Sequence, residues 1–200
     1  MAPDSLRLES VLVVLIDLAE GPLSSVRSMP SSELRGNAGA LAEICALLEI
    51  PVLVARAPLP AHASMVLPEI AARVPHAIEV LHETNDCLET AAFVAAVHAT
   101  GRTQLVFAGI ATDVGVALTA LSAKRAGYQA AVLADVCGTI SLRAEQAALC
   151  RLNQAGVILT GWSAFAAEVQ RNYTKGKGPQ VLELVSRYVF AGTQMAWNEE

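Results

Sequence analysis

The sequence predicts an α/β fold: a single domain built on one doubly wound parallel sheet of about six strands, with helices on both faces. Apolar runs of strand length alternate with longer segments of helical composition, a pattern typical of β-α-β units. Hydrophobic residues make up 54% of the 200 residues and charged residues only 16%. Such a composition fits a sheet buried on both faces together with a subunit interface. A chain of this length suits one α/β domain rather than two.

The first half of the chain predicts three strands and two helices. Val11–Ile16 is entirely apolar, as a strand buried on both faces would be. After a loop rich in Gly and Pro, Ser31 begins a helix that runs to about Leu48. The apolar run Pro51–Ala55 predicts the second strand. A proline-broken loop then leads to a short helix over Leu67–Arg73, and Ala77–Leu81 predicts the third strand.

The second half continues the alternation. Gln104–Ala108 is an apolar run that predicts the fourth strand, and the helix after Asp113 ends at Gly127, a residue favoured at helix C-termini. Tyr128–Ala134 predicts the fifth strand. The remaining expected elements are a helix over Glu89–Ala99, a helix over Ser141–Ala155, a sixth strand over Gly156–Thr160 and a helix over Ser163–Arg171.

The C-terminal segment differs in composition from what precedes it. Residues 174–179 form a polar linker, and an apolar tail follows it. We therefore expect a domain over residues 1–178. The tail, residues 179–200, is too short to be a second domain, so we expect it to pack on this domain or on a neighbouring subunit.

Charge and hydropathy exclude several classes of partner. The net charge is −5, without a basic stripe, so neither nucleic acid nor a membrane is expected as a partner. The longest apolar run, Val11–Ile16, is far too short to span a bilayer. No basic region followed by an apolar core marks the N-terminus as a secretory signal. These features favour a cytoplasmic protein that binds a small molecule.

Cysteine and histidine spacing predicts neither a disulfide framework nor a metal centre. The spacing of the four cysteines matches neither a disulfide framework nor a metal site; they are Cys45, Cys87, Cys137 and Cys150. The segment after the second strand, residues 56–62, supplies His62 but no carboxylate. We expect reduced thiols, no metal and no cofactor.

Polar residues follow the first and fourth strands directly. Asp17 comes after the first, and Thr112 and Asp113 come after the fourth. With a strand order of 3-2-1-4-5-6 these two strands are neighbours, and their carboxyl ends flank the switch point where such sheets bind ligands. Asp17 and the turn up to Gly115 would then share one pocket. The structural alternative is that Asp17 caps a loop and Asp113 is a first-turn carboxylate favoured by the helix dipole.

Five segments together resemble the isochorismatase-like cysteine hydrolases, and within that family the YcaC-like branch. They are Val13–Asp17, Gly109–Val116, Ala120–Ala123, Gly127–Tyr128 and Asp135–Thr139. Their order and spacing agree with the family from about residue 10 to residue 173. The resemblance implies a Rossmann-like three-layer sandwich and a hydrolytic activity on small molecules.

In that family a triad of Asp, Lys and Cys carries the reaction. The resemblance places the Asp at Asp17 and the Cys position at Gly115, which has no side chain. The Lys would lie near residues 80–83, yet no lysine occurs before Lys124, so two of three triad residues are not retained. The family's oxyanion hole uses backbone amides. These would fall at Ala111 and Gly115, with a cis peptide bond before Ala111.

True isochorismatases are similar to this chain in having Gly at the Cys position, and they use the Asp as a proton donor, but they keep the Lys. Two functions therefore stay open. One is a hydrolase without a cysteine nucleophile, with Asp17 as acid or base. The other is a catalytically inactive family member that serves as a binding or assembly subunit.

Three further residues are candidates for the pocket, each with a structural alternative. His82 is the nearest titratable group to the expected Lys position, or else a non-catalytic loop histidine. Cys87 lies in a loop that borders the family's pocket, or else is a partly buried loop residue. Arg56 follows the second strand and faces the crevice, or else forms a surface salt bridge.

The apolar composition and the oligomeric branch that the chain resembles predict a homo-oligomer of at least four subunits.

Overall fold

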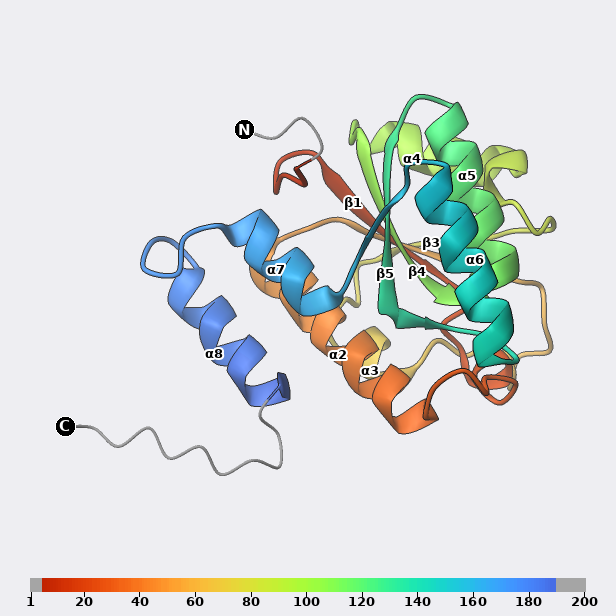
Figure 1. Ribbon diagram of the computed structural model, residues 1–200, viewed down its shortest axis with the longest axis horizontal. Helices are drawn as coiled ribbons and strands as arrows, with labels where there is room; N and C mark the ends of the chain where they lie inside the picture. The colour runs from red at the N-terminus through yellow and green to blue at the C-terminus, as the bar shows by residue number, and fades with distance from the viewer. Residues whose placement is uncertain (1–4, 190–200) are drawn as a thin grey trace.

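The computed structural model describes residues 5–189, and within them six parallel strands form one sheet (Figure 1). The spatial order is β3-β2-β1-β4-β5-β6, so the predicted doubly wound fold is confirmed. The strands are β1 (Val11–Ile16), β2 (Val52–Arg56), β3 (Ile78–Leu81), β4 (Gln104–Ile110), β5 (Gln129–Gly138) and β6 (Ile158–Thr160).

Helices cover both faces of the sheet. The α-helices are α1 (Glu20–Leu23), α2 (Ser31–Leu48), α3 (Pro68–Ala71), α4 (Ala91–Ala99), α5 (Ala117–Arg125), α6 (Leu142–Gln154), α7 (Trp162–Gln170) and α8 (Gly178–Val189). Two single turns complete the set: the 3₁₀ turn η1 (Cys87–Glu89) and the π-helical turn η2 (Thr112–Val116). Figure 1 shows α4, α5 and α6 on one side of the sheet and α2, α7 and α8 on the other.

The period-2 geometry of the strands divides the interior into two cores. Val11, Val13 and Leu15 of β1 pack on the face covered by α2, α7 and α8. Leu12, Val14 and Ile16 pack on the opposite face, where the inner residues of α4, α5 and α6 lie. Because both faces of β1 are buried, every one of its six residues is apolar.

The register of the two central strands brings their carboxyl ends together. β1 pairs with β4 so that Ile16 lies opposite Gly109, and it pairs with β2 so that Ile16 lies opposite Ala55. The chain leaves β1 at Asp17 and leaves β4 at Ala111. These two exits from the sheet are therefore adjacent, at the switch point of the strand order.

Two strands extend further than apolar runs alone indicate. β4 continues two residues past Ala108, through Gly109 and Ile110. β5 continues through Asp135 to Gly138, because the polar Asp135 has partners inside the fold. Its carboxylate accepts hydrogen bonds from the Trp162 backbone N–H at 2.9 and 3.2 Å, and its carbonyl oxygen accepts one from Asn37 at 2.7 Å.

The C-terminal segment forms the amphipathic helix α8 as far as Val189, and residues 190–200 of the expected tail lie outside the described residues. Figure 1 shows α8 beside α2 and α7. Val181 and Leu184 are buried in the core on that face of the sheet. Tyr188 packs edge-on against Trp162, with ring centroids 5.8 Å apart, and donates a hydrogen bond to Glu43 at 3.0 Å. These contacts join the described part of the segment to its own chain.

Within residues 5–189, every helix falls short of the length and apolar character needed to cross a membrane.

Candidate functional site

Asp17 occupies a sharp bend at the end of β1. Its φ is 50°, a left-handed conformation that Asp adopts more readily than most residues. Its backbone N–H donates to the Ala55 carbonyl oxygen at 2.9 Å, which extends the pairing of β1 with β2 by one residue. Its Oδ1 accepts a hydrogen bond from the Ala57 N–H at 2.6 Å. The bend therefore holds the carboxylate over the carboxyl ends of β1 and β2.

His82 faces the other carboxylate oxygen of Asp17. His82 Nε2 lies 3.1 Å from Asp17 Oδ2, and His82 Nδ1 lies 2.9 Å from the Thr84 carbonyl oxygen. Both side chains are largely buried, with 7% of the His82 side chain and 15% of the Asp17 side chain exposed. The hydrogen bond to Asp17 raises the pKa of His82 above its usual value, and burial opposes that rise. The two residues form one polar unit.

The turn after β4 approaches Asp17 from the neighbouring strand. The Ile110–Ala111 peptide bond is cis. The Ala111 carbonyl oxygen accepts hydrogen bonds from the N–H groups of Val114 and Val116, both at 3.2 Å. In this way the chain passes from the strand into helix α5 through the π-helical turn η2, which contains the buried Gly115.

Gly109 of β4 and Gly115 of the turn both lie against Ile16. Gly109 has a φ of 152°, and a Cβ there would lie 2.1 Å from the Ile16 carbonyl oxygen, so a side chain is excluded. A Cβ at Gly115 would lie 3.2 Å from Ile16 Cγ2. Ile16 is fully buried. Gly115 is thus packed against the residue that immediately precedes Asp17.

Thr112 and Asp113 connect the turn to the elements behind it. The Thr112 hydroxyl donates a hydrogen bond to Glu145 Oε1 at 2.8 Å, and both residues are buried. The Asp113 carboxylate accepts a hydrogen bond from the Thr139 hydroxyl, just beyond β5. Sequence analysis missed Glu145 and Thr139. The available signal for Glu145 was its place on one face of α6 with Ala148 and Leu152, at helical spacing.

Cys87 and Arg56 make contacts of other kinds. Cys87 is fully buried, and its backbone N–H donates to the Thr119 hydroxyl at 3.0 Å. Burial raises the pKa of the Cys87 thiol to about 12, which disfavours the nucleophilic thiolate. Arg56 is paired with Glu79, its Nη2 lying 2.8 Å from Oε2. The guanidinium is thereby directed along the edge of the sheet toward β3.

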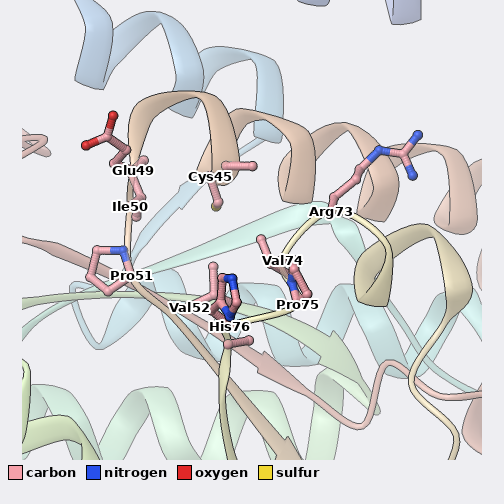
Figure 2. A pocket seen from close by; sticks show the side chains of 11 residues that line it. Cys45, Glu49, Ile50, Pro51, Val52, Arg73, Val74, Pro75 and His76 are labelled. Atoms are coloured by element: carbon pink, nitrogen blue, oxygen red, sulfur yellow. The ribbon is translucent and has the colours of Figure 1, made fainter.

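The walls of three cavities in the described part of the chain contain none of Asp17, His82 and Gly115. Figure 2 shows the cavity of about 360 Å³ between the end of α2 and the segment before β3, where Cys45, Pro51 and His76 contribute to the wall. It lies at the amino ends of β2 and β3, on the edge of the sheet opposite Asp17. Cavity shape alone therefore does not indicate the chemical site.

Among the described residues, no group of three His, Cys, Asp or Glu side chains has the arrangement of a metal site. Asp17 and His82 are only two side chains of this kind, and they form a hydrogen bond with each other.

Comparison with known proteins identifies the family. The model of the isochorismatase domain matches residues 11–164. The probable hydrolase YcaC of Escherichia coli is 32% identical over 162 residues, covering 80% of this chain and 78% of that protein.

Two solved structures have the same fold at 28–29% identity. The YcaC gene product of Escherichia coli, described as an octameric hydrolase of unknown specificity, superposes with a TM-score of 0.87, covering 92% of this chain and 91% of that one. YcaC from Pseudomonas aeruginosa, solved with hexane-2,5-diol and covalent acrylamide, gives a TM-score of 0.89, covering 96% and 95%. The chain belongs to the isochorismatase family of hydrolase-like proteins, in its YcaC-like branch.

Proposed function

We propose that this protein hydrolyses a small molecule without a cysteine nucleophile and that Asp17 is its catalytic acid or base. The observation that carries this proposal is the pairing of Asp17, at the carboxyl end of the central strand β1, with His82, which follows β3. A carboxylate held rigidly at the switch point of an open α/β sheet is well placed to exchange a proton with a bound ligand.

The backbone of the turn supplies the second half of the proposed machinery. We assign the N–H groups of Ala111 and Gly115 as donors to an oxyanion. Amides at the start of a helix lack partners inside that helix, and the helix dipole adds positive potential there. Donors of this kind stabilise charge that develops on a substrate oxygen during hydrolysis. The turn packs on Ile16, the residue that precedes Asp17, and this contact supports placing the two amides on the same side of the site as the carboxylate.

The described thiols are poor substitutes for a nucleophile at position 115. Cys87 is the candidate nearest in the fold, and its thiol is fully buried with a raised pKa. Cys45 and Cys137 are also buried, and desolvation raises the pKa of each. Cys150 is exposed on α6. A hydrolytic reaction in this protein would therefore use water rather than a protein thiol as the attacking group.

The test measures turnover of a panel of small amides, esters and ethers by the wild type and by Asp17→Asn. Loss of a general acid or base costs about 10²-fold to 10⁴-fold in rate, so we expect Asp17→Asn to lose at least about 10²-fold in kcat/KM. Glu9→Gln, which changes a carboxylate 74% exposed at its side chain, is the matched control and should retain full activity.

Alkylation of the wild type with iodoacetamide should leave turnover unchanged. A trapped thioester on Cys87 after addition of substrate would instead identify a cysteine mechanism.

The second candidate function is a binding or assembly subunit without activity. The observation that favours it is the tight contact between position 115 and Ile16, because a catalytic side chain at position 115 would have to displace that buried residue. Calorimetric binding of a panel compound, with no turnover of it by the wild type, would support this candidate against the hydrolase.

We propose that the chain assembles into a homo-oligomer of at least four subunits. Support comes from the octameric relative, and from large apolar side chains exposed near the carboxyl end of the sheet, such as Ile140 and Leu142, 64% and 56% exposed. Light scattering should give at least four times the subunit mass of 21.0 kDa. A mass of one subunit at micromolar concentration would contradict the proposal.

We also propose a cytoplasmic location, with a small molecule rather than nucleic acid as the ligand. The four cysteines are free, as thiols are in a reducing compartment. The net charge of −5 disfavours binding to a polyanion.

A further inference from the structure

The hydrogen bonds of His82 determine how many protons its ring carries. The residue follows β3, and its backbone N–H donates to the Arg56 carbonyl oxygen at 3.0 Å, which fixes the main chain beside β2. A carbonyl oxygen only accepts hydrogen bonds, so the contact of 2.9 Å between Nδ1 and the Thr84 oxygen requires a proton on Nδ1. That leaves Nε2 facing Asp17.

The second ring nitrogen also faces an acceptor. Asp17 Oδ2 lies 3.1 Å from Nε2, while Oδ1 already accepts the Ala57 N–H at 2.6 Å. A neutral ring protonated on Nδ1 would direct the lone pair of Nε2 at the carboxylate. The contact is favourable when a proton lies between Nε2 and Oδ2. A carboxyl group is ordinarily a stronger acid than an imidazolium, so the proton stays on Nε2, and the result is an imidazolium paired with an ionised carboxylate.

Asp17 is the counter-charge to this ring. Among the neighbouring groups, Arg56 is paired with Glu79, and Glu83 is exposed to solvent. The Asp86 carboxylate accepts hydrogen bonds from a backbone N–H and from a serine hydroxyl on α5. Burial keeps the Cys87 thiol neutral at neutral pH. The interactions that raise the pKa of the ring come from Asp17 and the Thr84 carbonyl.

We infer that His82 is a positioning residue that keeps Asp17 ionised as a general base, and that the substrate is therefore an acyl compound, an ester or an amide, attacked directly by water. This inference rests on the proposed function, in which Asp17 is either the catalytic acid or the catalytic base, and it assigns Asp17 as the base. An ionised Asp17 holds no proton for an ether oxygen, so hydrolysis that starts by protonating an ether is disfavoured.

The reaction balances with water as the co-substrate. Asp17 takes one proton from water, whose oxygen forms a bond to the acyl carbon. The carbonyl electron pair moves to the oxygen, which the Ala111 and Gly115 amides stabilise. When the carbon–heteroatom bond breaks, Asp17 returns the proton to the leaving oxygen or nitrogen. A carboxylate accepts about four hydrogen bonds, and two are used here, so capacity for the water remains.

The first experiment measures the protonation of His82 directly, whatever the activity. Imidazole ¹⁵N shifts are recorded against pH in the wild type and in Asp17→Asn, with His82→Gln used to assign the signals. We expect both ring nitrogens of His82 to be protonated at about pH 7, with a midpoint above that of an ordinary histidine. In Asp17→Asn the midpoint should fall. A ring that is neutral at that pH in the wild type overturns the inference.

The second experiment compares activity on p-nitrophenyl esters, small anilides and aryl vinyl ethers. The wild type should hydrolyse esters or anilides and leave the vinyl ethers unchanged. His82→Gln should lose about 10²-fold in kcat with little change in KM. His82→Lys should restore activity and move the alkaline limb of the pH profile upward, because lysine keeps its charge to higher pH.

The outcomes separate the inference from the proposed function. Hydrolysis of vinyl ethers alone, or full kcat in His82→Gln, overturns the inference and leaves a hydrolase. Absence of turnover on every probe overturns the proposed function and the acyl assignment with it, while the ¹⁵N titration still decides whether Asp17 and His82 form an ion pair.

Discussion

At the scale of single residues, the contact between Gly115 and Ile16 decides what position 115 can hold. A Cβ there would approach Ile16 Cγ2 to 3.2 Å, closer than ordinary van der Waals contact. Ile16, the last residue of β1, is fully buried, and its side chain lies on the face of the sheet that α4, α5 and α6 cover. The methyl group has little freedom to retreat, because close-packed interiors have few voids. Packing against Ile16 therefore disfavours any side chain at position 115, a nucleophilic one included.

We predict that Gly115→Cys destabilises the protein and does not create a cysteine hydrolase. Overpacking of a buried site costs about 1–3 kcal/mol, and the nearby carboxylate of Asp17 disfavours the thiolate. Urea unfolding measures the stability, and turnover of small amides measures the activity. Gly115→Ala is the control, since it adds the same Cβ without a thiol.

The packing explanation has its own check. Combined with Ile16→Ala, the Gly115→Cys change should cost less than the sum of the two single changes, because the enlarged site accepts the side chain. Strict additivity would refute the contact as the cause. Amide turnover by Gly115→Cys alone at a rate similar to that of an active cysteine hydrolase would refute the second half of the prediction.

At the scale of elements, the packing of helix α8 on α2 extends the core beyond the last strand. The helix buries Val181 and Leu184 at 1% and 3% exposure, while its other face exposes Leu182 at 48%. Glu43 of α2 accepts hydrogen bonds from Arg187 at 2.6 Å and from Tyr188 at 3.0 Å. Apolar burial on one side and polar contacts at the end fix the helix on its own chain.

Two leucines two residues apart allow a matched test of that packing. Leu184→Ala should lower the free energy of unfolding by about 2–5 kcal/mol, the usual cost of emptying a buried leucine site. Leu182→Ala should change it by no more than about 0.5 kcal/mol. Urea denaturation at a fixed protein concentration provides both values. Equal effects of the two changes would mean that α8 does not pack as described.

At the scale of the whole molecule, the pair of Asp17 and His82 links stability to pH. The hydrogen bond to Asp17 raises the pKa of His82 in the folded state above its ordinary value of 6.5. A group whose pKa is raised by folding stabilises the protein fully below its unfolded pKa. That stability is lost as pH rises through the folded value. The relevant window therefore begins near pH 6.5 and extends upward.

We predict that the free energy of unfolding of the wild type decreases between about pH 6 and about pH 8, and that His82→Gln flattens this decrease. This pH range ends below 9.0, the ordinary pKa of a cysteine thiol. At higher pH, cysteines ionise in the unfolded chain, and this lowers the free energy of unfolding further. His62→Gln, at an exposed position, is the control and should follow the wild type. The same slope in His82→Gln and in the wild type would show that the pair does not contribute.

The sequence by itself determined the alternation of strands and helices, the parallel sheet, and the place of Asp17 at the end of the first strand. Local patterns are sufficient for these, because apolar periodicity and Gly or Pro positions report the backbone directly. The order 3-2-1-4-5-6 is one of the common orders of doubly wound sheets, and the structure shows that this chain adopts it. With that order, the sequence predicts that Asp17 and the turn at Gly109–Gly115 are neighbours.

Only the tertiary structure decided which side chains Asp17, Thr112 and Gly115 contact. His82 is 65 residues from Asp17 in the chain and follows a strand two positions away in the sheet. Glu145 of α6 accepts a hydrogen bond from Thr112. Ile16, at the end of β1, packs against Gly115 in the turn that follows the neighbouring strand β4. Such contacts depend on where loops and helices converge after the sheet has formed. A pattern within a short window of sequence cannot predict these contacts, because the residues that form them are far apart in the chain.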